Sequence, residues 1–316
     1  RGTDDDVRVR THLPRIGQNS QQASAHLGLF LHGRRRILVT VNADRLQPEA
    51  GRDVGISTTL RAFIGKSCQQ FAYIVFNGEL IVAGDFTQVG GVSASRIAKW
   101  NGSNWLLFGN NSSVNNDIYA LAVYNNQLYA AGSFTSIGGQ NRSRVAMWDG
   151  SAWQPLGLGL NDVARTLAVY NNELVAGGDF TTAGGISANR IAKWNGSAWS
   201  VLGLGVNNSV YALANVNNEL IIGGSFTSVG GVSVNRIAKW NGSWAGFGTG
   251  MNGSVFSLTA YSGTGGFLAG GNFTTAGGIG ANRLAVWNGS NWSTLGTGMS
   301  GGDPIAYDKL LIATGA

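Results

Sequence analysis

Asparagine recurs at one register position of this chain, each time six residues before a leucine. The four asparagines are Asn115, Asn161, Asn207 and Asn252. The next position holds Asn116, Asp162, Asn208 and Gly253, and Asp117 follows in the first of these copies. Amide and carboxylate oxygens are the hard donors that Ca²⁺ and Mg²⁺ prefer. If these side chains encircled a common axis, they would hold a divalent metal able to bind an anionic ligand or to activate water.

This pattern gives one metal hypothesis and one structural alternative. The predicted ligands of Ca²⁺ or another divalent metal are Asn115, Asn161, Asn207, Asn252, Asp117 and Asp162. The alternative is that each asparagine caps a turn through its own side-chain hydrogen bonds, because a residue repeated in every copy more often serves the repeat than a ligand.

Function usually breaks the symmetry of a repeat, so the residues that differ between copies are the other candidates. Asp117 and Asp162 are candidate catalytic carboxylates, and Arg165 with Asn116 and Asn208 forms the candidate ligand-binding set. Cys68 is a candidate nucleophile that would need a base nearby. The three histidines lie at positions 12, 26 and 32, which argues against a histidine-ligated metal or a Ser-His-Asp triad within residues 71–316.

The elements that position these residues repeat with a long period. Trp100, Trp148, Trp194, Trp240 and Trp287 are 48, 46, 46 and 47 residues apart. Phe86, Phe134, Phe180, Phe226 and Phe273 follow the same intervals. A period of this length is typical of repeat folds. We interpret the recurring aromatic residues as core between neighbouring repeats.

One copy predicts four short antiparallel strands. The runs 210–216 and 219–227 flank Asn217-Asn218, which tolerates the positive φ of a tight hairpin turn. A glycine-rich loop over 228–234 precedes a third strand over 235–240. Asn241-Gly242 then predicts a second hairpin, which leads into a strand over 244–247. Four strands in about 47 residues indicate one blade of a β-propeller.

The sequence therefore predicts an all-β fold with five full copies from about residue 71 to residue 298. The segment 307–315 aligns without a gap on 170–178, so the C-terminus resembles the inner strands of a sixth copy. Strands over 36–42 and 56–63 would complete that blade, which leaves no open sheet edge. We predict six four-stranded blades closed by both termini, with five blades as the alternative. The expected domains are a basic leader, 1–35, which is disordered in this interpretation, and a single propeller, 36–316.

Charge and composition narrow the classes of partner. The net charge is +6, but residues 1–70 hold 11 of the 22 Lys and Arg and only 6 of the 16 acidic residues. The basic balance thus belongs mainly to residues 1–70, which have no Trp or Tyr to stack on bases, and we expect no nucleic-acid partner. No apolar run is long enough for a membrane helix. We expect the protein to be a monomer. The given sequence starts at Arg1, and we recognise no signal peptide in it.

The repeat units also resemble a known class of propeller. Gly177-Gly-Asp-Phe-Thr181, Ala183-Gly-Gly185 and Asn189-Arg-Ile-Ala-Lys-Trp194 are similar to repeats of bacterial surface proteins and of the fungal Rax2-like cell-polarity proteins. The Gly-Gly doublet followed by a later tryptophan also resembles kelch repeats. This resemblance implies a secreted or cell-surface setting and a role in adhesion or scaffolding, with no catalytic residue to carry over.

Two functions follow from these observations. The first is a non-catalytic propeller that binds a protein, glycan or small-molecule ligand or serves as a scaffold. The alternative is a divalent-metal-dependent hydrolase, similar to lactonases and phosphotriesterases, with its site at the mouth of the central channel. Asp117, Asp162 and the asparagine set would hold its metal, and an acidic side chain would act as base.

Overall fold

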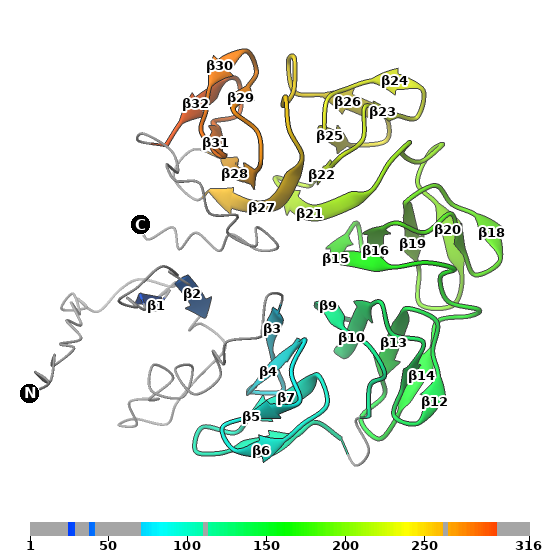
Figure 1. Ribbon diagram of the computed structural model, residues 1–316. Coiled ribbons are helices and arrows are strands. Elements are labelled where there is room, and N and C mark those ends of the chain that lie inside the picture. The colour runs from blue at the N-terminus through cyan, green and yellow to red at the C-terminus, as the bar shows by residue number, and fades with distance from the viewer. Residues whose placement is uncertain (1–24, 29–37, 42–70, 110–112, 262–264, 296–316) are drawn as a thin grey trace, which may run out of the picture.

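The computed structural model describes residues 25–28, 38–41, 71–109, 113–261 and 265–295. Their architecture is five four-stranded antiparallel sheets, each accompanied by a small two-stranded sheet. The five large sheets stand side by side around a common centre, with the first strand of each nearest to it (Figure 1). The predicted all-β blade architecture is confirmed.

The large sheets share one up-and-down strand order. The first contains β3 (Phe71–Phe76), β4 (Glu79–Gly84), β7 (Ile97–Trp100) and β8 (Trp105–Leu107). The second contains β9 (Ile118–Tyr124), β10 (Gln127–Gly132), β13 (Val145–Trp148) and β14 (Trp153–Pro155). The third contains β15 (Ala164–Tyr170), β16 (Glu173–Gly178), β19 (Ile191–Trp194) and β20 (Trp199–Val201). The fourth contains β21 (Val210–Val216), β22 (Glu219–Gly224), β25 (Ile237–Trp240) and β26 (Trp244–Gly246). The fifth contains β27 (Val255–Tyr261), β28 (Gly266–Gly271), β31 (Leu284–Trp287) and β32 (Trp292–Thr294).

The turns within a sheet follow from asparagine chemistry. Asn217 and Asn218 have φ of 50° and 62°, which is the left-handed pair that a tight hairpin needs between β21 and β22. The Asn241-Gly242 turn joins β25 to β26, whose Trp240 and Trp244 pair directly. Both predicted hairpins are confirmed.

The glycine-rich loop contains structure that the sequence did not predict. In the fourth sheet β23 (Ser228–Val229) and β24 (Val232–Ser233) pair across the turn at Gly230 and Gly231. A Cβ on Gly230 would lie 2.5 Å from Cδ1 of Trp244, so glycine is required there. Two-residue strands are too short to show an alternating pattern, which is why only a loop was predicted. The corresponding hairpins are β5 (Gln88–Val89) with β6 (Val92–Ser93), β11 (Ser136–Ile137) with β12 (Gln140–Asn141), β17 (Thr182–Ala183) with β18 (Ile186–Ser187), and β29 (Thr275–Ala276) with β30 (Ile279–Gly280).

Three predicted strand boundaries in this copy were wrong, and one of them, the end of the strand predicted over 244–247, differs by a single residue because β26 ends at Gly246. The strand predicted over 219–227 ends at Gly224, because the chain turns at Ser225, whose N–H donates to the Ser209 carbonyl. The strand predicted from 235 begins at Ile237, because Arg236 has a left-handed φ of 61°.

Aromatic side chains form the core between sheets. Phe134, Phe180, Phe226 and Phe273 have no exposed surface. Each sheet also pairs two tryptophans from its third and fourth strands, with ring centroids 4.9 to 5.6 Å apart. Phe108, which follows the first sheet, packs 5.1 Å from Trp148 of the second. Burial of both faces of a sheet against its neighbours is what a stack of blades requires.

The prediction of a sixth blade rests largely on residues beyond those described. The segments 56–63 and 307–315 lie outside the described residues. The strand predicted over 36–42 corresponds to β2 (Leu38–Val41), which pairs antiparallel with β1 (Ala25–Gly28), a strand from within the predicted leader. Within the described residues, no helix is long and apolar enough to span a membrane.

Candidate functional site at the start of the inner strands

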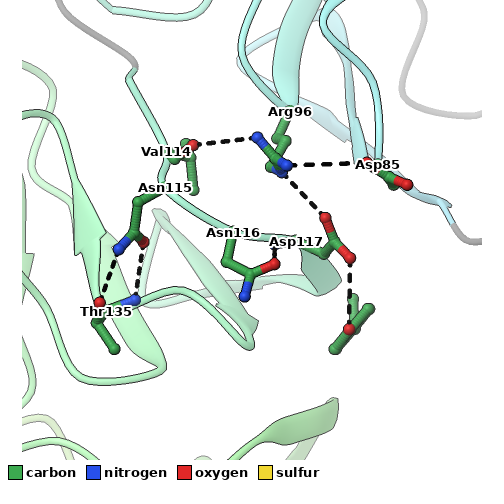
Figure 2. A network of polar contacts seen from close by, with 8 residues as sticks. Asp85, Arg96, Val114, Asn115, Asn116, Asp117 and Thr135 are labelled. Atoms are coloured by element: carbon green, nitrogen blue, oxygen red, sulfur yellow. Dashed lines mark hydrogen bonds and ion pairs between the residues drawn. The ribbon is translucent and has the colours of Figure 1, made fainter.

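The four asparagines of the predicted metal site are engaged in each sheet's own backbone. The Asn115 side-chain oxygen accepts hydrogen bonds from the backbone N–H groups of Thr135 and Ser136, at 2.9 and 3.0 Å, and its Nδ2 donates to the Thr135 hydroxyl (Figure 2). Asn161, Asn207 and Asn252 repeat all three bonds in their own sheets. Each carboxamide oxygen thus has both lone pairs occupied and ties the entry to an inner strand onto the small hairpin of its sheet.

The residues that follow these asparagines also bond locally. The side-chain oxygens of Asn116, Asp162 and Asn208 each accept from the next backbone N–H, at 2.9, 2.7 and 2.8 Å. All three side chains are exposed. Cys68 lies outside the described residues. Within the described ranges, no group of three or more His, Cys, Asp or Glu side chains could hold a metal ion.

Asp117 belongs to an ion-pair network between the first two sheets. Its Oδ1 accepts from Arg96 Nε at 3.0 Å, and the same guanidinium lies 3.9 Å from Asp85 and 3.4 Å from the Val114 carbonyl (Figure 2). The hydroxyl of Tyr119 is 3.5 Å from Asp117 Oδ2. This carboxylate therefore links two blades and orients the base of an inner strand.

A β-bulge that was not predicted from the sequence recurs at the same end of four inner strands. In β15, Ala164 pairs with Gly178 and Thr166 with Gly177, which leaves Arg165 without a partner in the ladder. The same irregularity occurs in β9, β21 and β27. The residues that the ladder register skips, which we call the bulge residues, are Tyr119, Arg165, Tyr211 and Phe256. Bulges commonly re-aim a side chain next to functional sites.

Glycine makes each bulge possible. A Cβ added to Gly178 would lie 2.1 Å from the Val163 carbonyl oxygen, and Gly132, Gly224 and Gly271 would suffer equivalent clashes at 2.0 to 2.1 Å. The glycine that closes the second strand in these four copies was the signal from which the bulge could have been suspected, because glycine inside a strand often marks one; Gly84 closes β4 in the same way without a bulge.

Three bulge residues form a continuous contact chain. The Arg165 guanidinium carbon is 5.2 Å from the ring centroid of Tyr211, and that ring is 5.3 Å from the ring of Phe256. Tyr119 lies on the other side, close enough to act electrostatically on Arg165. All four side chains are partly exposed. The structure thus assembles aromatic faces and one cation from separate blades.

Asp179 fixes the position of Arg165. Nε and Nη2 of Arg165 are 2.8 and 2.6 Å from Asp179 Oδ2. Burial opposes the charged form of Asp179, but hydrogen bonds from Arg165 and Ser209 and the charges of Arg165 and Arg190 outweigh it and lower the pKa of Asp179. Burial likewise tends to lower the pKa of Arg165, yet the bond to Asp179 and the charge of Asp179 leave that pKa raised. The pair is therefore ionised at neutral pH.

A match to a family model agrees with this architecture and names no chemistry. Residues 77–102, 125–146 and 217–244 match a family model described as "Domain of unknown function (DUF5122) beta-propeller". No curated protein matches. Among solved structures, the computationally designed Ika4 protein is 19% identical with a TM-score of 0.36, over 55% of this chain and 92% of that chain. The WD40 propeller domain of Doa1 is 14% identical with a TM-score of 0.39, over 63% of this chain and 59% of that chain. The chain is an all-β repeat protein whose five four-stranded sheets are consistent with propeller blades.

Proposed function

We propose that this protein is a non-catalytic binding protein and that its bulge residues contact the ligand, a protein or a glycan. The observation that carries the proposal is the contact chain of Arg165, Tyr211 and Phe256, presented partly exposed by three separate blades. Tyrosine, phenylalanine and arginine supply large contact area with few rotatable bonds, and tyrosine and arginine dominate binding hot spots.

The charges around these residues favour a ligand of low net charge. Arg165 is neutralised by Asp179, and Asp117 by Arg96, so neither ion of the two pairs needs a counter-charge from a ligand. The groups that can still contact a ligand are the faces of the aromatic rings and the exposed amide and carboxylate groups of Asn116, Asp162 and Asn208. Rings with amides beside them suit either the apolar face of a sugar or a peptide loop.

A secreted or cell-surface setting, as implied by the repeat resemblance, belongs to the same proposal. An extracellular binding role would use a rigid scaffold whose variable residues face a ligand.

The proposal is tested by binding to two probe sets, an array of neutral oligosaccharides and a displayed library of short peptides. We expect the wild-type protein to bind a ligand from one of the two sets. Its affinity for that ligand should fall at least tenfold in Tyr211→Ala. Tyr261→Ala is the matched control, since Tyr261 is also a partly exposed tyrosine on an inner strand but lies at the opposite end of β27. Equal loss in both variants, or none in either, would contradict the proposal.

A further inference from the structure

Every blade carries an arginine in the left-handed region just before its third strand. These are Arg96, Arg144, Arg190, Arg236 and Arg283, with φ between 61° and 66°. In the first sheet the guanidinium has two acidic neighbours, Asp85 and Asp117 (Figure 2). In the third sheet Arg190 donates to the Asp179 carbonyl, and its charge acts on the Asp179 carboxylate. At both positions a carboxylate from the same register stands near the cation: Asp85 lies 3.9 Å from Arg96, and Asp179, which pairs with Arg165, feels the charge of Arg190.

The second sheet keeps the arginine and lacks the acid. Ser133 stands where the other two sheets have Asp85 and Asp179, and Arg144 donates through Nη1 to the Ser133 carbonyl at 3.0 Å. Within the described part of the chain, Arg144 forms no ion pair.

Two polar atoms at this place are buried and lack a hydrogen-bond partner. They are Nε of Arg144, which can only donate, and the hydroxyl of Ser133, which can donate as well. A buried donor without a partner costs about 1–3 kcal/mol, so native structures almost always fill such a position. The bond from Arg144 Nη1 to the Ser133 carbonyl holds these two residues together, and two buried donors beside a cation without an ion pair favour an acceptor with negative charge.

We propose that Arg144 and Ser133 bind a small monovalent anion, chloride in physiological solution, which replaces the aspartate of the neighbouring blades. The anion accepts from Arg144 Nε and from the Ser133 hydroxyl and balances the guanidinium charge. A water molecule would satisfy the same donors and would leave the charge unbalanced. The site is independent of ligand binding at the bulge residues.

The fourth sheet supplies a matched control. Ser225 and Arg236 are the same residue types at the same register, but Arg236 reaches the Met251 carbonyl, and neither Arg236 Nε nor the Ser225 hydroxyl is among the buried atoms without partners. We therefore assign an anion to the second sheet and none to the fourth.

The experiment measures Tm at constant pH and ionic strength while chloride replaces gluconate. We expect chloride to raise the wild-type Tm by about 3 °C, since a ligand of the folded state stabilises it by mass action. Ser133→Asp should raise the Tm in gluconate and abolish the chloride effect, because the new carboxylate takes the anion's place. Ser225→Asp should leave the chloride effect unchanged.

Crystals of the wild-type protein grown in bromide give a readout that needs no variant. We expect an anomalous peak within hydrogen-bond reach of Arg144 Nε and none at Arg236. A water at Arg144 without an anomalous signal, or a Tm that is equal in chloride and gluconate, would overturn the proposal. So would a Ser133→Asp variant that keeps the full chloride dependence.

Discussion

The guanidinium of Arg165 lies over the ring of Tyr211, with its central carbon 5.2 Å from the ring centroid, and joins the third blade to the fourth. The same group is held from its own sheet by Asp179. A cation over an aromatic face contributes about 0.5–1 kcal/mol at a partly exposed site. One side chain thus combines an ion pair within a blade and a ring contact between blades.

Arg165→Met should lower the free energy of unfolding by about 2 kcal/mol, because it leaves Asp179 a partly buried carboxylate with less compensation. The value is set below that of a fully buried pair because Arg165 is 33% exposed and solvent screens it. Urea denaturation of Arg165→Met, Asp179→Asn and the double variant measures the coupling. Strictly additive losses would show that the two side chains do not interact.

Asp179 predicts a specific acid sensitivity. Its folded-state pKa lies below the unfolded value of about 3.9, so the ionised form stabilises the fold above that pH and this contribution is lost as the pH falls through the folded-state pKa. Asp179→Asn should be less stable at pH 7 and should decline less steeply than the wild type below about pH 4. Asp162→Asn, at an exposed site, is the control for removal of one negative charge. If the stability of the wild type and of Asp179→Asn fell equally steeply with decreasing pH, the assignment would be contradicted.

Gly178→Ala should remove the bulge that presents Arg165. The new Cβ would lie 2.1 Å from the Val163 carbonyl oxygen, a backbone atom that cannot move alone. We expect a loss of about 3 kcal/mol, typical of overpacking against a fixed backbone. Gly280→Ala is the control, since Gly280 has open space around its Cβ position and no positive φ. A loss confined to 0.5 kcal/mol in both variants would mean that the strand accommodates the methyl group.

Asn161→Ala distinguishes a structural asparagine from a metal ligand. It removes two bonds accepted from Thr181 and Thr182 and one donated to the Thr181 hydroxyl, all at 2.9 Å. We expect the free energy of unfolding to fall by about 1–2 kcal/mol, by the same amount with calcium or with a chelator. If calcium stabilised the wild type and not the variant, the metal hypothesis would gain support.

The tryptophan pairs allow a comparison within one chain. Nε1 of Trp199 donates to the Leu156 carbonyl at 2.8 Å, whereas Nε1 of Trp153 is buried and has no partner among the described residues. Trp199→Phe should therefore cost about 1 kcal/mol more than Trp153→Phe, because it also leaves a buried carbonyl unsatisfied. Thermal unfolding of the two variants measures the difference. Equal losses would show that the hydrogen bond contributes nothing beyond packing.

The blade was predictable from the sequence because its determinants are local. The 46- to 48-residue tryptophan spacing and the Asn217-Asn218 turn identified strands and hairpins that the structure confirms. Strand ends were less accurate where a single backbone angle decides them, as at Arg236.

The site was harder to predict because its geometry depends on a register slip. Tyr211 belongs to an ordinary apolar strand pattern, and nothing in that pattern shows that it leaves the ladder. Asn115 was easy to notice because asparagine recurs at its register position. The sequence could not show that its side-chain oxygen already accepts two hydrogen bonds from backbone N–H groups. The serine at position 133, where two other copies have aspartate, is visible in the sequence, but only the structure shows that Arg144 Nε is buried without a hydrogen-bond partner.

A residue that the β-ladder skips has no residue directly opposite it on the next strand, so its side chain does not have to pack against a cross-strand partner. Tyrosine, arginine, tyrosine and phenylalanine occupy the four bulge positions, while the paired residues on either side of each bulge remain small or aliphatic, apart from the serine and threonine that follow two of them. Four of the five large sheets therefore offer one place where mutation changes the chemistry shown to a ligand without replacing a paired residue of the ladder. Gene duplication of such a unit would let a lineage diversify recognition one blade at a time, with little risk to folding.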